Sequence, residues 1–294
     1  MTEIINRKSF SKTILVFLFL VVSCNPTDQT KKNNPVAKVV TQKQGNLILV
    51  ANGESFVRDG FITKDAWKIE FNKLTVSVGN VIAYQTETGF DPDQNQIIDS
   101  KLAIPLTKEI KVIDLIPASK PKNSISPSLT SKDLTIVKKI AVPVGSYRAI
   151  SWEMAPKNDF GGETETIFLQ GNATKNGKKI NFELGFLLPI KYICGEFIGE
   201  ERKGIVAKDK LTELEMTFHF DHLFGDSNIS VDDALNQEAL GFEPLAKLAS
   251  AGSLKLDWQK LQQKLEPSDL EILTKAIAGL GHVGEGHCKA IYEE

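Results

Sequence analysis

Histidine, cysteine, methionine and excess basic charge are all scarce in this chain. Its 294 residues include four histidines, three cysteines and three methionines, and the formal net charge is −2. Without a basic excess or a basic stripe, we expect no nucleic-acid partner. The dispersal of Met1, Met154 and Met216 also disfavours a thioether site for copper(I).

Several motifs of catalysis and nucleotide binding are missing as well. The chain has no G-x-S-x-G elbow, no P-loop, no G-x-G-x-x-G and no H-E-x-x-H. A serine nucleophile, a bound nucleotide and the strict zinc-protease motif therefore have no support. Composition is ordinary for a globular protein, with 41% apolar and 24% charged residues.

The N-terminus has the pattern of an export signal. Basic residues precede an apolar run at positions 13–22, which is long enough for a signal peptide and short for a membrane span. The run ends in Val21-Val22-Ser23-Cys24, which resembles the lipobox of bacterial lipoproteins. This resemblance implies cleavage before Cys24 and lipidation of Cys24. It also implies a lipid anchor in the bacterial cell envelope, with the outer membrane or cell surface favoured. A plain signal peptide or an uncleaved anchor is the alternative.

Four segments are expected along the chain. Residues 1–23 form the signal peptide, and the polar residues 24–43 form a flexible tether. Residues 44–225 have the short alternating runs and turn residues of an antiparallel β-sandwich. Residues 226–294 have helical periodicity and form a helical C-terminal subdomain packed on the sandwich. The fold class is therefore mainly β.

Two local features of the β region can be predicted closely. Apolar residues alternate over 67–71 and then with the opposite parity over 74–78, which indicates a bulge or a sheet corner near Asn72-Lys73. Asn176-Gly177 separates two strand-like runs and is the usual pair for a type I′ hairpin turn.

Two short motifs also occur in a known group of proteins. They are Val112-Ile113-Asp114-Leu115 and Gly145-Ser146-Tyr147-Arg148-Ala149-Ile150. With the strands around them, over about residues 55–190, the chain resembles secreted prokaryotic lipoprotein domains of unknown function with a transthyretin-like sandwich. The resemblance implies a fold and no chemistry.

The C-terminal part has expected helix starts and a glycine-rich end. Ser230–Asp233 and Ser268–Glu271 have the pattern of capping boxes. The second helix is expected to stop at Gly279 and Gly281, leaving Gly281–Cys288 as a loop.

With Cys24 assigned to a lipid, Cys194 and Cys288 remain as a pair. They form a disulfide or serve as two thiolate metal ligands, and an oxidising compartment favours the disulfide. The bridge would hold the C-terminal histidines against the middle of the chain.

All four histidines fall in two short windows, His219 with His222 and His282 with His287. Gathered neutral imidazoles most commonly hold a metal ion, so we expect the four side chains to meet. In a strand over 211–220, His219 lies opposite the aromatic face. His222 can join it only where that strand ends in a turn.

The ligand types indicate which metal would bind. Imidazoles with optional carboxylates from Asp221 or Glu285 suit Zn²⁺ first, then Cu²⁺, Ni²⁺ or iron. The two acids can instead orient the rings.

Three functions remain open. The first is an envelope lipoprotein that binds a metal, with zinc preferred, in a structural, storage or delivery role without catalysis. The second is a non-metal adhesion or interaction lipoprotein with an envelope protein partner, which predicts histidines without mutual contact. The third is a zinc hydrolase with three close histidines and Glu285 as general base at an open position. The metal-binding functions predict nitrogens within about 4 Å of one another.

Overall fold

The computed structural model describes residues 43–94, 97–116, 134–159, 162–163 and 165–292. The expected signal peptide, the lipidation site Cys24 and nearly all of the tether lie outside these residues. Residues 42–294 form one compact unit. Within the part of the chain that the structure describes, no helix is long and apolar enough to cross a membrane.

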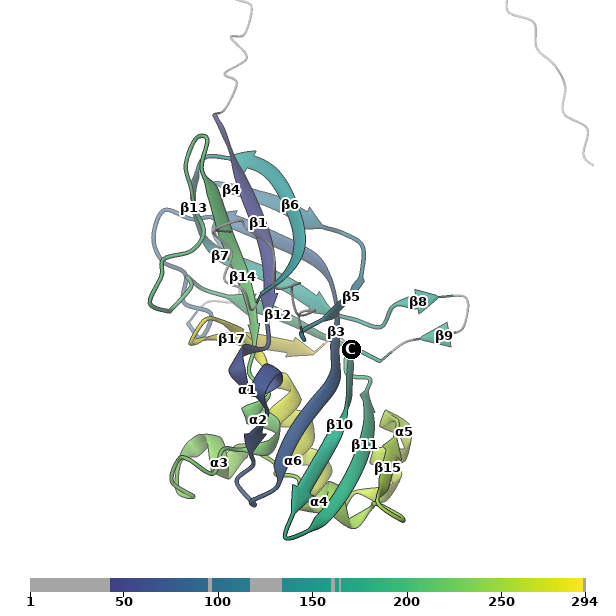
Figure 1. Ribbon diagram of the computed structural model, residues 1–294. Coiled ribbons are helices and arrows are strands. Elements are labelled where there is room, and N and C mark those ends of the chain that lie inside the picture. Colours follow the sequence, from purple (N-terminus) through teal and green to yellow (C-terminus); the bar gives the residue numbers. More distant parts are fainter. Residues whose placement is uncertain (1–42, 95–96, 117–133, 160–161, 164, 293–294) are drawn as a thin grey trace, which may run out of the picture. The chain divides into compact units, whose positions relative to one another are not determined.

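Strands make up nearly half of the described chain and far more of it than helices do (Figure 1). In order they are β1 (Gln44–Asn52), β2 (Phe61–Ile62), β3 (Lys68–Gln85), β4 (Leu102–Thr107), β5 (Lys111–Asp114), β6 (Thr135–Pro143), β7 (Gly145–Met154), β8 (Asn158–Asp159), β9 (Gly162–Glu163), β10 (Ile167–Lys175), β11 (Lys178–Phe186), β12 (Ile190–Cys194), β13 (Ile205–Val206), β14 (Leu211–Phe218), β15 (Ser253–Leu256), β16 (Gly281–Val283) and β17 (Gly286–Tyr292).

The helices are short and mostly follow β14. They are α1 (Glu54–Asp59), α2 (Asp221–Phe224), α3 (Ala234–Glu238), α4 (Glu243–Lys247), α5 (Trp258–Lys264) and α6 (Pro267–Ala278). The predicted mainly β class is confirmed, since a large mixed sheet with few helices is consistent with a β-sandwich.

The main sheet runs in the order β15-β11-β10-β3-β7-β12-β17-β16-β14-β1-β6. Most neighbours are antiparallel, but β1 pairs with β14 and β11 pairs with β15 in parallel. Parallel strands must be joined by a long crossover connection, so they come from segments far apart in the sequence. The alternation of apolar residues within one segment therefore does not predict such a pair. The β1–β14 pair matters most here, because it aligns Asn52 with Thr217.

The long strand β3 connects two parts of the sheet. Its first half pairs with β10, and its second half pairs with β7 (Figure 1). The register jumps from Gln170↔Lys73 to Gly171↔Phe71, so Asn72 has no partner on β10. The predicted bulge is confirmed at this position. The hairpin prediction is confirmed as well, with positive φ at Asn176 (49°) and Gly177 (80°).

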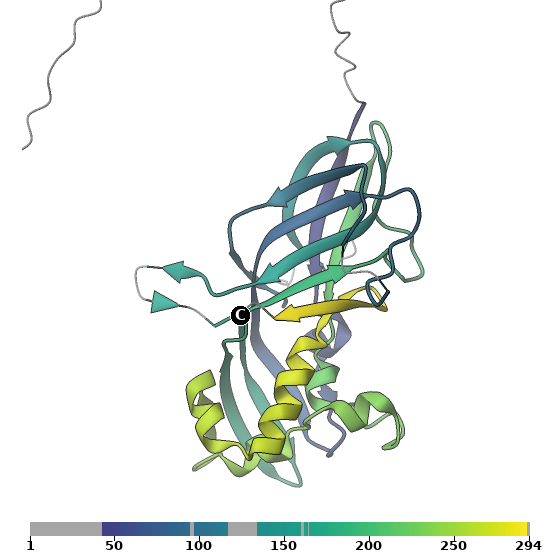
Figure 2. The same cartoon turned by 180° about the vertical axis from the view of Figure 1, so that it is seen from behind.

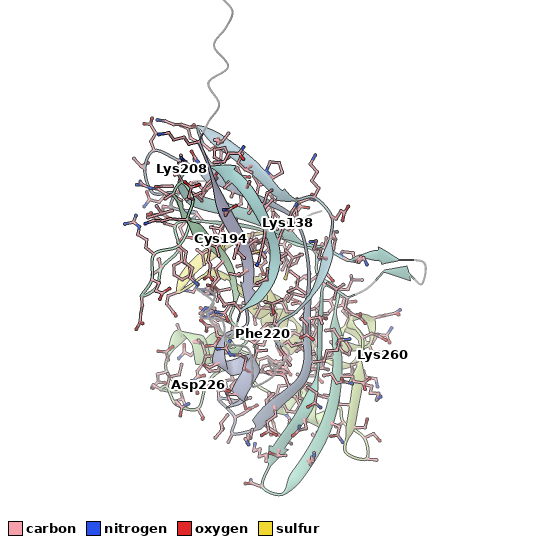
Figure 3. All side chains as sticks on the ribbon, turned by 45° about the horizontal axis from the view of Figure 1, so that its top comes forward. Lys138, Cys194, Lys208, Phe220, Asp226 and Lys260 are labelled. Atoms are coloured by element: carbon pink, nitrogen blue, oxygen red, sulfur yellow. A yellow bond between two sulfur atoms is a disulfide. The ribbon has the colours of Figure 1, made fainter. Side chains whose placement is uncertain are left out.

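Aromatic side chains fill the core on both sides of this bulge. Trp152 packs against Tyr192 and Phe218, with ring centroids 5.4 and 6.1 Å apart. The buried residues Cys194 and Phe220 lie inside the fold, whereas the exposed lysines Lys208 and Lys260 lie outside (Figure 3). This aromatic cluster packs next to the segments that carry the histidines.

The C-terminal residues hold strands as well as helices. The predicted loop Gly281–Cys288 is wrong, because these residues form the hairpin of β16 and β17, which follows α6 (Figure 2). β16 pairs with β14, and β17 pairs with β12. Because the segment is rich in glycine, the sequence shows no clear alternation of apolar and polar side chains that would predict these strands.

The predicted capping boxes are also wrong in detail. Helix α3 is capped by Asp233, whose carboxylate accepts a 3.0 Å hydrogen bond from the Leu235 N–H. Helix α6 starts at Pro267 after Glu266, so Ser268 lies inside it and does not cap it. Proline suits the first helical position, because its fixed φ fits the helix and its missing N–H would have no partner within the helix there.

Candidate metal centre

Two of the histidines lie where β14 gives way to α2. The strand ends at Phe218, so the prediction of a strand to Phe220 is wrong. The backbone N–H of His222 donates to the His219 carbonyl at 3.2 Å, in a helical turn. This turn brings His222 onto the same side as His219, because residues three apart share a helix face.

The other two histidines come from the β16–β17 hairpin. His282 lies directly opposite Thr217 on β14 and opposite His287 on β17. The preceding residue, Gly281, crosses the face of the Tyr192 ring, where an added Cβ would lie 2.4 Å from the ring. Only glycine allows this close approach, so it fixes where His282 enters the site.

The four imidazoles form one contiguous cluster. The ring centroid of His282 lies 4.0 Å from that of His219, 5.0 Å from that of His222 and 4.4 Å from that of His287. His219, His222 and His282 each offer a nitrogen within 4.8 Å of the other two. The structure therefore brings all four predicted histidines together, around His282 as the central ring.

Backbone carbonyls fix the tautomers of the two most buried rings. His219 and His282 are 7% and 2% exposed. The Nε2 of His219 lies 3.1 Å from the Gly284 carbonyl oxygen, and that of His282 lies 3.1 Å from the Gly279 carbonyl oxygen. A carbonyl can only accept, so the neutral form of each ring carries its proton on Nε2. Both therefore keep a lone pair on Nδ1.

The Nδ1 of His282 is buried and has no hydrogen-bond partner. Leaving such a nitrogen unpaired costs about 1–3 kcal/mol. A metal ion would satisfy this lone pair. The donor set, neutral imidazoles whose other nitrogen is bonded to a backbone carbonyl, is the usual arrangement of metal-ligating histidines.

The rings need some rearrangement before they can share an ion. Tetrahedral zinc with bonds of about 2.0–2.1 Å requires nitrogens about 3.3 Å apart. The nitrogens of His219, His222 and His282 lie within 4.8 Å of one another. This separation is wider than tetrahedral zinc requires, and wider than the value of about 4 Å expected from the sequence. The planes of His219 and His282 are also nearly parallel, at 18°. Because lone pairs lie in the ring plane, at least one of these rings must tilt to bind the same ion.

The two predicted carboxylates lie in different surroundings. Asp221 is 6% exposed, and its Oδ1 accepts a 3.1 Å hydrogen bond from the His222 N–H. Glu285 is exposed in the hairpin turn, where its backbone N–H donates to the Ile198 carbonyl at 2.8 Å. Asp221 is thus the predicted acid built into the buried side of the cluster.

A third acid, Glu54, lies at the site and was not predicted from the sequence. It is the first residue of α1, and its Oε1 lies 3.6 Å from the Nε2 of His219. It reaches the site because β1 runs parallel to β14 and ends beside it. The glutamate follows a glycine after a short apolar run, and nothing in that pattern relates it to histidines 165 or more residues away.

Burial keeps the central rings neutral. Burial is the largest cause, and the neighbouring His219 and His287 act in the same direction, so that the pKa of His222 is lowered to about 4. Burial, followed by the other three histidines, holds the pKa of His282 far below its usual value of 6.5. At neutral pH these rings therefore present lone pairs and no charge, which is the state that a metal requires.

These pKa shifts predict a stability loss in acid for the metal-free protein. With chelator present, the unfolded chain protonates His222 near pH 6.5, whereas the folded chain does so only near pH 4. Stability is thus complete above pH 6.5 and falls as the pH drops towards 4, by about 3 kcal/mol for this residue. Urea unfolding at pH 7 and pH 4.5 measures the loss. A His222→Asn variant with an unchanged pH dependence would contradict the assignment.

The predicted disulfide between Cys194 and Cys288 is present. The two residues lie directly opposite each other on β12 and β17, with Cα atoms 4.3 Å apart. Because both sulfurs are in the bridge, the alternative of two thiolate ligands is wrong. The bridge holds β17 against the centre of the sheet, one residue after His287.

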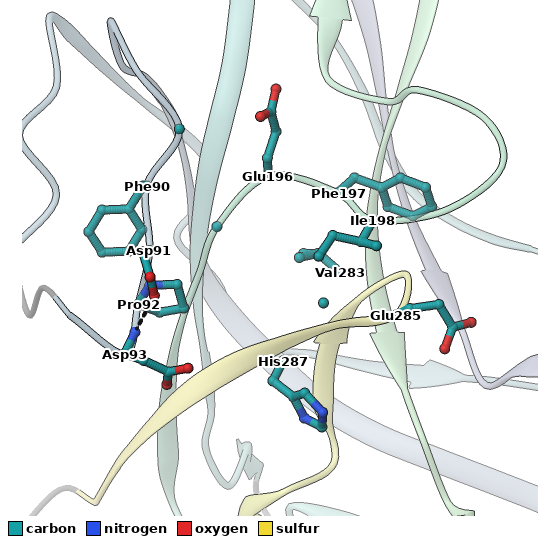
Figure 4. Close-up of a pocket in the computed structure, with 13 residues that line it drawn as sticks. Phe90, Asp91, Pro92, Asp93, Glu196, Phe197, Ile198, Val283, Glu285 and His287 are labelled. Carbon is teal, nitrogen blue, oxygen red and sulfur yellow. Dashed lines mark hydrogen bonds between the residues drawn. The ribbon is translucent and has the colours of Figure 1, made fainter.

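An open cavity of about 550 Å³ adjoins the exposed member of the cluster, His287. It lies between the loop carrying Phe90 and Pro92 and the turn carrying Ile198, with His287 at its edge (Figure 4). Glu285 also lines it. The cluster therefore has a buried side around His282 and an open side at His287.

Comparisons with known proteins do not extend this description. The lipobox and the transthyretin-like resemblance consequently stay predictions from sequence. No protein-family model matches the chain, and no curated protein or solved structure matches it.

Proposed function

We propose that this chain is an envelope-anchored lipoprotein that binds one transition-metal ion, with zinc as the preferred ion. The ligands are His219, His222 and His282, with His287 as the fourth. Such a centre serves a structural, storage or delivery role. Imidazole ligands also suit Cu²⁺, Ni²⁺ and iron, which are the competing ions. The anchor is the lipid on Cys24.

The observation that carries this proposal is the unpartnered Nδ1 of His282, buried among three further imidazoles. A fold that only packed histidines would pair this nitrogen with a donor or expose it to water. Two carbonyls instead occupy the Nε2 atoms and leave the Nδ1 lone pairs available. This supports a cluster shaped for a cation.

The test is metal analysis of the purified full-length protein after loading with Zn²⁺, Cu²⁺, Ni²⁺ or Fe²⁺ and desalting. We expect one tightly held zinc ion per chain. His219→Ala and His282→Ala should weaken binding by more than the roughly 100-fold that a lost outer partner costs. Gln262→Ala, an exposed change on α5, is the matched control and should bind as the unaltered chain does. Absence of bound metal in the unaltered protein would refute the proposal.

A zinc hydrolase is the second candidate, and the exposure of His287 favours it. His287 lines the open cavity together with Glu285, so the ion could keep an open position there with Glu285 as general base. His287→Ala separates the two candidates. If the variant keeps its zinc, three histidines suffice and the unaltered protein has an open site. If the variant loses its zinc, the unaltered protein has a closed site with four histidine ligands. The adhesion alternative predicts histidines that do not touch, and the ring contacts argue against it.

A further inference from the structure

We propose that Glu54 is the carboxylate partner of this centre. It assists the Gly284 carbonyl in keeping His219 protonated on Nε2, and it supplies the charge by which the site selects a divalent ion over monovalent copper. This inference rests on the proposed metal-binding function and names the ion class and the residue that selects it.

The first support is the position of Glu54 relative to His219. Its Oε1 lies 3.6 Å from the Nε2 that faces the Gly284 carbonyl. A carboxylate on this side of the ring favours the Nε2–H tautomer and raises the basicity of Nδ1. Metal-binding histidines commonly have such a partner on the nitrogen away from the ion.

The second support is the backbone of Glu54, which adopts an unfavourable conformation for a residue with a side chain. Its φ is 59°, in the left-handed region. Its N–H donates to the Oδ1 of Asn52 at 2.8 Å, which holds this conformation. Strained residues of this kind concentrate at functional sites, because the surrounding structure must enforce them.

The third support is one buried carboxylate that connects Glu54 and His219 through their neighbours. Glu215, 3% exposed, accepts hydrogen bonds at its Oε1 from Asn52 Nδ2 (2.8 Å) and Thr217 Oγ1 (3.2 Å). Asn52 in turn holds the Glu54 N–H, and Thr217 Oγ1 accepts from the Gly284 N–H at 2.9 Å. Through Asn52 and Thr217, the same carboxylate therefore helps to position the backbone of Glu54 and of Gly284, the residue whose carbonyl binds His219.

Charge balance identifies the class of ion. Glu215 forms an ion pair with Lys203, which also lies 3.7 Å from Glu213. The Oε1 of Glu54 lies 3.6 Å from the Nε2 of His219, and the Oδ1 of the buried Asp221 accepts a hydrogen bond from the His222 N–H. These two carboxylates beside the imidazoles would balance the charge of an M²⁺ ion, whereas Cu⁺ would leave one negative charge uncompensated. Carboxylates also favour harder ions than Cu⁺, which prefers sulfur.

The experiment uses Glu54→Gln in the full-length protein, with Asp59→Asn as the matched control. Asp59 is exposed at the other end of α1, so the control makes the same charge change on the same helix. Zn²⁺ and Cu⁺ affinities are measured by competition with chromophoric chelators. We expect Glu54→Gln to weaken Zn²⁺ binding about 10–100-fold, to change Cu⁺ binding less than about threefold, and the control to change neither.

A second variant guards against a folding artefact. Glu54→Gly removes the carboxylate and relieves the positive φ, so it should fold at least as well while losing the same Zn²⁺ affinity. Long-range imidazole NMR of ¹⁵N-labelled protein reads the tautomer of His219 in each variant. We expect a dominant Nε2–H form in the unaltered chain and a reduced population without Glu54.

The outcomes separate this inference from the function on which it rests. An unaltered protein that binds no ion overturns both. An unaltered protein that binds zinc, with Glu54→Gln binding it equally well, overturns only the role of Glu54. Equal weakening of Zn²⁺ and Cu⁺ overturns the selection of a divalent ion.

Discussion

Replacing both Cys194 and Cys288 by alanine should lower the free energy of unfolding by about 4–5 kcal/mol. The bridge joins residues 94 positions apart, and closing so long a loop restricts the unfolded chain strongly in the chain-entropy model. Alanine is preferred to serine, because Cys194 is fully buried and a hydroxyl there would need a partner. Urea denaturation of the two proteins measures the difference.

The unaltered protein under a thiol reductant provides a second route to the same state. Both should show the same loss, and Lys289→Ala, on β17 beside the bridge, should show less than about 0.5 kcal/mol. A loss below about 1 kcal/mol in the double variant would mean that strand pairing alone secures the C-terminal hairpin. Zinc affinity should fall in the double variant too, since β17 carries His287 next to Cys288.

Zinc at a free concentration 1,000 times its dissociation constant should stabilise the folded protein by about 4 kcal/mol. An ion that binds only the folded state adds RT ln(1 + [L]/Kd) to its stability. His282→Ala should abolish this gain, because it removes the ring that contacts the other three. The measurement is urea denaturation with zinc and with chelator.

The comparison is made within each variant, so any cavity that alanine leaves affects both conditions equally. Glu271→Gln, an exposed change on α6, should keep the full gain. An equal zinc-dependent gain in His282→Ala would move the binding site away from the cluster.

Local chemistry explains which predictions from the sequence were accurate. The bulge at Asn72 and the turn at Asn176-Gly177 follow from parity and from residues that accept positive φ, and both act over a few positions. The disulfide followed from counting cysteines after one was assigned to lipid. The meeting of the histidines followed from their confinement to two windows.

The remaining features depend on pairings between distant segments. His222 joins the cluster because the chain enters a helical turn after Phe218, two residues before the alternation ends. The glycine-rich C-terminal segment is a hairpin because β12 and β14 offer it partners, not because of its own propensity. Glu54 reaches the site through the parallel β1–β14 pair, whose strands lie far apart in sequence.

The two roles of β3 bear on cooperativity. Its first half supplies ladder partners to β10 and its second half to β7, with the Asn72 bulge between them. If either part of the sheet unfolds, β3 loses hydrogen-bond partners, and the other part depends on β3. Amide protons along β3 should therefore exchange together, through one global opening. The metal centre should unfold in the same cooperative step as the β10–β11 hairpin.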